Sequence, residues 1–276
     1  MRAWLIYDMA GAQRNQDYIR MHRELAEEFH IDLRLVMDTA VFDLLEAETG
    51  EFPDFCFVRT IRPQLSRLLE EKGIRIFNSA LISELCNDKG KTIQYVESHT
   101  NVPVIPTECF GRGRLTRELL LQHKNSVIKA VDGHGGEQVF LTSESYEEIV
   151  RNIGSSDFIL QPLIQGPGKD IRVYVIGNRI MGAVERIAGS GFKANFSLGG
   201  EIRPCDITLE LQKLVCAICD VLSFGMVGID FIVDQKGNLL FNEIEDVVGA
   251  RMFYQCYPQI DLLREYFLYA INSLDA

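Results

Sequence analysis

The chain has 276 residues, of which 47% are hydrophobic and 24% charged, a composition typical of a globular protein with a sizeable core. Asp and Glu outnumber Lys and Arg by 39 to 28, and the net charge of −11 argues against a nucleic-acid partner while leaving room for a local small-anion site. No apolar run is long enough to cross a membrane, and the apolar stretch at the N-terminus is too short for a secretory signal. The seven cysteines are irregularly spaced, which favours free thiols in the cytoplasm.

The first third of the chain alternates strands and helices. Tyr18, Met21, Leu25 and Phe29 recur at helical spacing and predict an amphipathic helix over 13–29. A second helix is expected at 63–72, and strands are expected at 4–7, 33–37, 55–58 and 74–77. This alternation predicts a small α/β domain with a parallel sheet, ending near residue 83.

The middle of the chain, to about residue 164, mixes helices and strands. Helices are expected at 89–99, 115–123 and 144–152, and strands at 127–129, 138–141 and 158–161. The last part is expected to be antiparallel, with one hairpin around Gly177-Asn178 and a second formed by 227–233 and 239–244. Helices are expected at 208–222 and 262–274, and the latter, with Phe267 and Tyr269, could pack at an interface of a homo-oligomer.

The second hairpin predicts a face of carboxylates. A four-residue loop at 235–238 would place Asp230 opposite Glu243 and Gly228 opposite Glu245. Because side chains alternate along a strand, Asp230, Glu243 and Glu245 would share one face. The other face would take Ile229, Phe231, Val233, Leu240 and Ile244.

Directly opposed carboxylates repel one another, so this arrangement favours a bound cation or a shared proton. Oxygen ligands alone suit Mg²⁺ or Mn²⁺ better than zinc. Gly228 would leave room for a ligand to approach. The alternative is that the three acids only line a solvated sheet edge.

A glycine-rich loop follows a lysine at the end of a buried strand. Lys129 ends the strand, and Gly133, Gly135 and Gly136 follow with His134 among them. Main-chain N–H groups of such a loop can cradle phosphate while the lysine supplies positive charge. The pattern is no Walker loop, and a glycine-rich turn without a ligand is the alternative.

Further basic and polar residues alternate with apolar ones on the strands that follow. They are Asp170 with Arg172, then Arg186, then Lys193 with Asn195. A cleft lined by these side chains and facing the carboxylates would hold a polyphosphate between protein cations and metal. Taken singly, each of these residues is better explained as an exposed charge on a strand.

In this order, the motifs resemble the ATP-grasp superfamily, and most closely its RimK-like carboxylate–amine ligases. The resemblance covers about residues 85–250. Its motifs are Asn87-Asp88-Lys89, Ile128-Lys129 with 132–136, 160–164, Asp170-Ile171-Arg172-Val173, 192–200, Gly228-Ile229-Asp230 and Asn242-Glu243-Ile244-Glu245. Each motif is degenerate, but the ordered set is specific.

The resemblance implies an α/β fold in three parts, with the nucleotide between the second and third. These are a parallel-sheet pre-grasp domain at 1–84 and two α+β ATP-grasp subdomains at 85–164 and 165–276. The implied ATP site consists of Lys89, Lys129, Gly133, Gly135, Gly136, Gln161, Pro162, Leu163, Asp170, Lys193, Ala194 and Asn195. In this set, the backbone at 160–164 would read the adenine edge and the glycine loop would close as a lid.

The resemblance also implies Mg²⁺ or Mn²⁺ on Asp230, Glu243 and Glu245, and catalytic roles for Arg172, Arg186 and Lys193. One position departs from the family, because Glu245 stands where the family has Asn. The extra negative charge puts the number and placement of metals in question. Arg251, six residues further on, could receive a substrate carboxylate.

The implied reaction joins a small-molecule or peptide carboxylate to an amine, such as that of an amino acid, through an acyl phosphate, releasing ADP and phosphate. Two alternatives remain open on the residues alone. One is a small-molecule kinase with a hydroxyl acceptor on the same scaffold. The other is a nucleotide-binding regulatory module without turnover.

Overall fold

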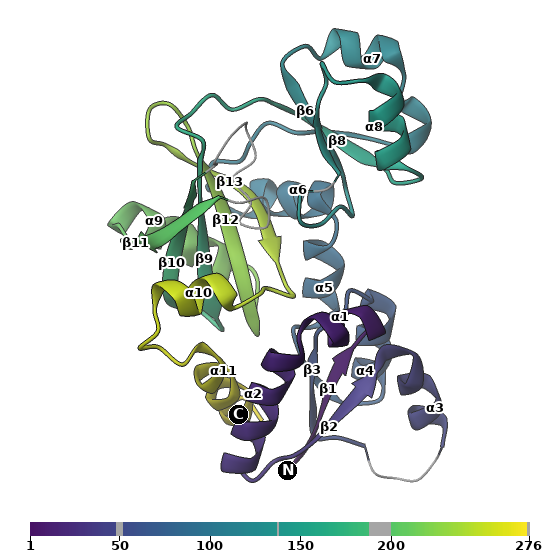
Figure 1. Ribbon diagram of the computed structural model, residues 1–276, viewed down its shortest axis with the longest axis vertical. Coiled ribbons are helices and arrows are strands. Elements are labelled where there is room, and N and C mark those ends of the chain that lie inside the picture. Colours follow the sequence, from purple (N-terminus) through teal and green to yellow (C-terminus); the bar gives the residue numbers. More distant parts are fainter. Residues whose placement is uncertain (48–51, 137, 188–199, 275–276) are drawn as a thin grey trace.

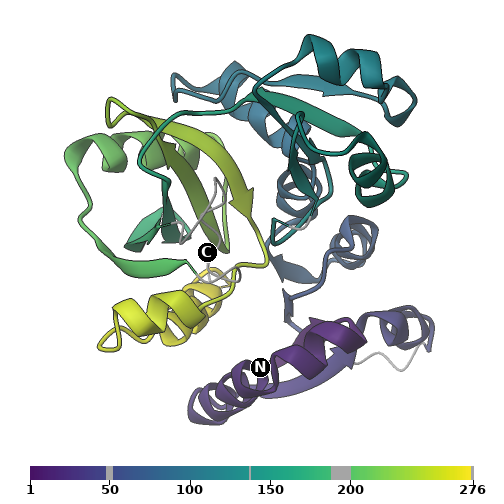
Figure 2. The same cartoon turned by 45° about the horizontal axis from the view of Figure 1, so that its top comes forward.

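The computed structural model describes residues 1–47, 52–136, 138–187 and 200–274. Three sheets follow one another along the chain, one in each third of the molecule (Figure 1). In that view the N-terminal sheet lies at the bottom, the sheet of the middle segment at the upper right and the C-terminal sheet at the left. Figure 2 shows the same three units with the top of the molecule turned forward.

The N-terminal unit confirms the predicted parallel sheet, with strand order β2-β1-β3-β4. Its elements are β1 (Arg2–Tyr7), α1 (Met9–Arg14), α2 (Gln16–Glu28), β2 (Asp32–Met37), the 3-10 helix η1 (Asp38–Ala40), α3 (Val41–Glu46), β3 (Phe55–Val58), α4 (Pro63–Glu71) and β4 (Arg75–Phe77). The helix expected over 13–29 is instead two helices that break at Asn15. The Asn15 side chain donates to the Gly11 carbonyl at 2.8 Å and ends α1, which carries no apolar stripe that periodicity could detect.

The middle unit is an antiparallel sheet of order β5-β8-β6-β7. Its elements are α5 (Ala80–Cys86), α6 (Lys89–His99), β5 (Glu108–Phe110), η2 (Arg112–Arg114), α7 (Arg117–Gln122), β6 (Ser126–Ala130), β7 (Val139–Leu141), α8 (Tyr146–Ile153) and β8 (Phe158–Pro162). Leu120 of α7 and Ile149 of α8 pack on Ile128 and Leu160 of the sheet. This small core holds β6 and β8, the strands that lead into the cleft.

The C-terminal unit is an antiparallel sheet of order β11-β10-β9-β12-β13. Its elements are β9 (Lys169–Ile176), β10 (Arg179–Ile187), β11 (Glu201–Cys205), α9 (Leu209–Cys219), β12 (Met226–Val233), β13 (Leu239–Glu245), α10 (Arg251–Cys256) and α11 (Leu262–Asn272). Both predicted hairpins are present. One face of the sheet packs on α9 and α6 through an apolar core, and the other face carries the charged residues described below.

Helix α11 packs against the N-terminal unit. Its Leu263 and Phe267 are buried in a core shared with Phe57 of β3, and the rings of Phe57 and Phe267 are 4.9 Å apart. The Tyr269 hydroxyl donates to the Phe224 carbonyl at 2.8 Å. The apolar face that suggested an interface between copies is therefore covered within the chain. A homo-oligomer stays a prediction.

Two predictions about composition can be compared with the fold. Across the described ranges, no helix combines the length and apolar character needed to cross a bilayer. All seven cysteines lie within these ranges and carry free thiols, as their irregular spacing predicts.

Candidate active site

The three units meet around a cavity of about 560 Å³, a volume within the range of small-molecule sites. It is lined by α6, the glycine loop, β8, β9, β10, β13 and the segment after β13. Of the predicted site residues, those that line it are Lys89, Lys129, Gly133, Gly135, Gly136, Gln161, Pro162, Leu163, Asp170, Arg172, Arg186, Glu243 and Glu245. Asp230 lies behind this lining, and Lys193, Ala194 and Asn195 fall outside the described residues.

The hairpin β12–β13 confirms part of the predicted register. Asp230 faces Glu243 and Gly228 faces Glu245, but the register shifts after Asp230 because β13 contains a bulge at Asn242. The extra residue lets the neighbours Asn242 and Glu243 both line the cavity.

The same bulge reverses the faces beyond it. Leu239 and Phe241 join the core, and the prediction that Leu240 lies there is wrong. A one-residue shift exchanges the two faces of a strand, and the loop length alone cannot reveal a bulge.

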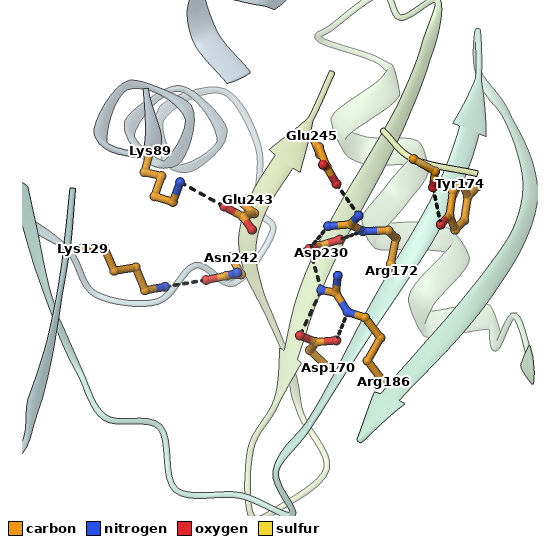
Figure 3. A network of polar contacts seen from close by, with 11 residues as sticks. Lys89, Lys129, Asp170, Arg172, Tyr174, Arg186, Asp230, Asn242, Glu243 and Glu245 are labelled. Atoms are coloured by element: carbon orange, nitrogen blue, oxygen red, sulfur yellow. Dashed lines mark hydrogen bonds and ion pairs between the residues drawn. The ribbon is translucent and has the colours of Figure 1, made fainter. Parts of the chain in front are cut away.

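Asp230 is the centre of a buried ion network (Figure 3). Arg172 donates to both of its oxygens, each at 2.8 Å, and Arg186 Nη2 donates to Oδ2 at 2.6 Å. Arg186 also binds Asp170 through two bonds of 2.5 and 2.9 Å. Strand pairing places Asp230 opposite Arg172 and Arg186 opposite Asp170, so the sheet register itself builds the network.

The network holds its charges in the ionised state. Burial alone would raise the pKa of Asp230, but Arg172 and Arg186 hold it below its usual range. Burial raises the pKa of Asp170 to about 6, although Arg186 opposes the shift. Burial alone would lower the pKa values of the two arginines, but Asp230 raises both of them. Asp230 is thus a buried anion that protein cations neutralise.

Gly228 makes room for this network. A Cβ atom at this position would lie 2.8 Å from Val248 Cγ2 and 3.1 Å from Arg172 Cδ. The space that the sequence suggested for a ligand is therefore filled by the chain's own side chains. Glycine is needed here so that the arginine can reach Asp230.

Two lysines connect the middle unit to β13. Lys129 is buried on β6 and donates to Asn242 Oδ1 at 2.9 Å, and burial lowers its pKa to about 8. Lys89, the first residue of α6, donates to the Gly133 carbonyl, and its Nζ lies 3.3 Å from Glu243 Oε2. Burial alone would raise the pKa of Glu243, but Lys89 helps to hold it below its usual range. Lys89 therefore bridges the glycine loop and β13, and Lys129 connects β6 to β13.

Positive and negative charges are balanced in the part of the cleft around Asp230 and the two lysines. Four cations, Lys89, Lys129, Arg172 and Arg186, accompany four carboxylates, Asp170, Asp230, Glu243 and Glu245. From the described residues, a polyphosphate entering this part would meet no excess positive charge, so these residues favour a polyphosphate that brings cations of its own.

A preformed metal cluster is absent from the described part of the chain, where no three Asp, Glu, His or Cys side chains are placed to hold a metal ion. Both oxygens of Asp230 accept guanidinium bonds, so the structure gives this predicted ligand different partners. Of the three predicted metal ligands, Glu243 and Glu245 line the cavity, with side chains 31% and 39% exposed. Their oxygen atoms fit the preference of Mg²⁺, and a bound Mg²⁺ would compete with Lys89 and Arg172 for them.

The segment expected to read an adenine edge follows β8. Gln161 is buried, and its Nε2 donates to Thr107 Oγ1 at 2.8 Å. The Leu163 N–H donates to the Asn125 carbonyl at 3.0 Å, so this N–H is already paired within the chain. Base recognition through the N–H of Leu163 therefore does not fit the structure, and a role for the rest of the segment stays a prediction.

The other end of the cavity lies beyond Glu245. Arg251 lines it, where a substrate carboxylate is expected, together with Arg14 and Ile61 from the N-terminal unit. Sequence reasoning missed these two residues because neither belongs to a motif. A usable signal was their place in the chain: each lies in the segment after a parallel strand, β1 or β3, and ligands collect at the carboxyl edge of such strands.

Sequence comparison and fold comparison both relate this chain to ATP-grasp proteins. The model of the RimK-like ATP-grasp domain matches residues 118–266. Beta-citrylglutamate synthase B of Danio rerio is 25% identical over 285 residues, covering 92% of this chain and 70% of that protein. N-acetylaspartylglutamate synthase A of Homo sapiens is 27% identical over 223 residues, covering 74% of this chain and 56% of that protein.

A solved D-alanine–D-alanine ligase from Bacillus anthracis, complexed with ATP, has the same fold. The two superpose with a TM-score of 0.76 over 99% of this chain and 97% of the ligase, at 11% sequence identity. At this identity the likeness establishes the architecture alone.

Proposed function

This chain belongs to the RimK-like ATP-grasp family, and on that premise we propose that it is an ATP-dependent carboxylate–amine ligase. Both relatives described above are named as synthases of amide-linked compounds, and the ATP-bound structure of the same fold is a ligase. One observation carries the proposal to this chain. Lysines from two elements and the glycine loop line one cavity together with a carboxylate strand.

ATP would lie with its phosphates beside Lys89, Lys129 and the glycine loop. The loop is suited to phosphate because Gly135 and Gly136 adopt positive φ values of 64° and 79°, a conformation that side chains disfavour. Lys193, Ala194 and Asn195 are proposed to complete the nucleotide site. Closure of the loop would exclude water that otherwise hydrolyses a reactive intermediate.

Metal ions would be held by Glu243 and Glu245 on the cavity side of β13. The charge balance among the described residues of this end supports that proposal, because ATP bears several negative charges and these residues offer no net positive charge to meet them. Bound Mg²⁺ would neutralise the phosphates and polarise the transferring group.

Catalysis would depend on position and charge. Asp170 and Asp230 hold Arg186 and Arg172 in place, so these guanidinium groups need no rearrangement as charge develops. The substrate carboxylate would attack the terminal phosphorus, breaking the bond to the ADP oxygen and forming an acyl phosphate. An amine then attacks the acyl carbon, loses a proton and expels phosphate. The free thiols support a cytoplasmic location for this reaction.

Interception of the acyl phosphate by hydroxylamine tests the proposal. The protein is incubated with ATP, Mg²⁺, hydroxylamine and a panel of acids and alcohols, and hydroxamate and ADP are quantified. We expect hydroxamate to form in proportion to ADP. ADP formed together with a stable phosphorylated alcohol would instead identify a kinase, and tight ATP binding without ADP release would identify a regulatory module.

A pair of variants makes this assay specific to the site. Glu243→Gln should abolish Mg²⁺-dependent turnover, because it removes a carboxylate that faces the cavity. Glu27→Gln changes an exposed glutamate on α2, outside the cavity lining, and should keep full turnover.

A further inference from the structure

The segment that joins β13 to α10 lines the far part of the cavity. It spans residues 246–250, and Asp246, Val247 and Gly249 belong to the cavity lining together with Arg251, the first residue of α10. The segment is neither strand nor helix, so its backbone polar groups need partners from elsewhere in the chain. We call it the β13–α10 segment. The side chains that bind its backbone decide which surface it presents to the cavity.

Asn78 binds this segment from the N-terminal unit. It is 5% exposed and directly follows β4. Its Nδ2 donates to the Asp246 carbonyl and to the Met226 carbonyl, each at 2.9 Å, and its Oδ1 accepts from the Gly225 N–H at 2.5 Å. Both N–H donors and the oxygen of the carboxamide are thus used. Met226 begins β12 and Asp246 follows β13, so one amide joins the two strands at the end of the hairpin.

Arg59 binds the same segment two residues further on. It directly follows β3, is 7% exposed, and donates from Nη2 to the Val248 carbonyl at 2.9 Å. Its guanidinium lies over the Tyr18 ring, 5.4 Å from the centroid, which gives the cation a second contact. Strands β3 and β4 are neighbours in a parallel sheet, so Arg59 and Asn78 occupy its carboxyl edge, where such sheets bind ligands. In this chain that edge binds the backbone of the β13–α10 segment.

Two further side chains complete these contacts. Asn87 Nδ2 donates to Asp246 Oδ1 at 3.0 Å, and the Tyr174 hydroxyl donates to the Gly249 carbonyl at 3.0 Å (Figure 3). The carbonyls of residues 246, 248 and 249 are therefore all bound by side chains. These bonds leave the segment little freedom in its path along the cavity.

We propose that Asn78 and Arg59 are positioning residues for the acid substrate, because they fix the path of the β13–α10 segment along the part of the cavity where that acid would lie. The inference rests on the proposed function. Neither belongs to the described residues that line the cavity, so each acts through the backbone that it binds. A displacement of about 1 Å in a group that positions a substrate can cost about a hundredfold in rate. ATP affinity should change little, since the lysines proposed to bind ATP lie on β6 and α6.

Steady-state kinetics of matched variants test the inference. Arg59→Met removes the donor, Arg59→Lys keeps a cation that can donate to the Val248 carbonyl, and Asn78→Ala removes both bonds to carbonyls. Leu69→Ala is the control, because Leu69 is fully buried on α4 in a core on the other face of the sheet, so its loss lowers stability without a change at the segment. Each variant is assayed with hydroxylamine and the acid that yields most hydroxamate with the parent chain, at a temperature where circular dichroism shows it folded. Should Asn78→Ala fail to fold, the two Arg59 variants decide alone.

We expect Arg59→Met to raise KM for the acid by about tenfold or more, and Asn78→Ala to lower kcat/KM by about a hundredfold, because Asn78 binds two carbonyls. Arg59→Lys should restore KM to within about threefold of the parent, and the calorimetric affinity for ATP should stay within about threefold in every variant. Leu69→Ala should keep the parent's KM although it melts at a lower temperature. Kinetic constants of Arg59→Met and Asn78→Ala that match those of Leu69→Ala, or an equal loss of affinity for ATP and acid, would overturn the inference.

Hydrogen exchange keeps this test separate from that of the ligase. Exchange of the backbone amides of residues 246–251 is measured by mass spectrometry in the same variants. If no acid is turned over, the proposed function fails, and exchange still shows whether the two residues hold the segment. A rise of about tenfold or more in Arg59→Met and Asn78→Ala, with none in Leu69→Ala, would retain that role. Exchange equal to that of the parent in both variants would refute it.

Discussion

Arginines lie at both ends of the cleft, but in the described part of the chain they are paired with carboxylates only at the end around Asp230, here called the paired end. At the far end, beyond Glu245, they are unpaired. Beside Asp230, each guanidinium is buried and bonded to carboxylates of neighbouring strands. At the far end, Arg14 and Arg251 are exposed and have no carboxylate partner within the described ranges. Paired charges fix a framework, whereas unpaired charges remain available to a ligand.

This difference also separates stability from binding. A buried ion pair contributes little net stability compared with an apolar pair, but removal of one partner leaves an uncompensated charge in a low dielectric. An exposed arginine without a partner can be replaced at almost no cost to folding. Substitutions at the two ends should therefore affect different measurements.

The largest effect is expected for Asp230→Asn, which should lower the free energy of unfolding by about 3–5 kcal/mol, because both Arg172 and Arg186 lose a buried counter-ion. Urea denaturation monitored by circular dichroism measures it. The repulsion between opposed carboxylates that the sequence suggested would instead predict a gain in stability. Arg14→Gln is the matched control and should stay within about 0.5 kcal/mol of the parent. A parent-like midpoint for Asp230→Asn would show that the network does not support the fold.

That reversal shows what the sequence could and could not predict. Period-two alternation and the loop length placed Asp230 opposite Glu243, because register depends on local geometry. They could not identify the cation that balances Asp230. Arg172 comes from a neighbouring strand, 58 positions earlier in the chain, so the pairing depends on strand order.

The next effect concerns nucleotide affinity at the paired end. Lys129→Ala should weaken ATP binding tenfold or more, since a charge-assisted bond to phosphate contributes about 1.5–3 kcal/mol. Isothermal titration calorimetry measures this. Lys124→Ala alters an exposed lysine outside the cavity and should bind ATP as the parent does. If Lys129→Ala bound ATP with the affinity of the parent chain, strand β6 and the glycine loop that follows it would not belong to the ATP site.

A smaller effect should come from crowding the paired end. Gly228→Ala should lower the free energy of unfolding by about 1–3 kcal/mol, because the new methyl group would meet Val248 at 2.8 Å and Arg172 at 3.1 Å. Chemical denaturation measures the change. Gly113→Ala is the control, as a Cβ there meets nothing within 4 Å and the backbone is not left-handed. Equal midpoints for the two variants would mean that the arginine can move aside freely.

Other gaps between sequence and structure have equally specific causes. Helix α10 and strand β5 are only six and three residues long, too short for a periodic pattern. The bulge at Asn242 leaves no mark in the alternation of apolar and polar residues that surrounds it. The place of Arg14 after a parallel strand is a usable signal, but the packing of the N-terminal unit on the other two, which brings it to the cavity, is encoded by no local pattern.

The smallest expected effect is a pH dependence of ATP affinity that belongs to the paired end alone. Burial lowers the pKa of Lys129 from 10.5 to about 8, so the unliganded folded chain loses this positive charge as pH rises through that value. Because the unfolded chain binds the proton more tightly, Lys129 itself adds stability to the unliganded fold as pH rises between these values.

Phosphate favours the protonated amine, so ATP binding should take up a proton above the lowered pKa. The dissociation constant should then rise about fivefold to tenfold from about pH 7.5 to about pH 9.5. Lys129→Arg keeps its charge throughout this range and should flatten the profile, whereas Arg14→Gln should reproduce the parent curve. An equal slope in Lys129→Arg would assign the titration to another group.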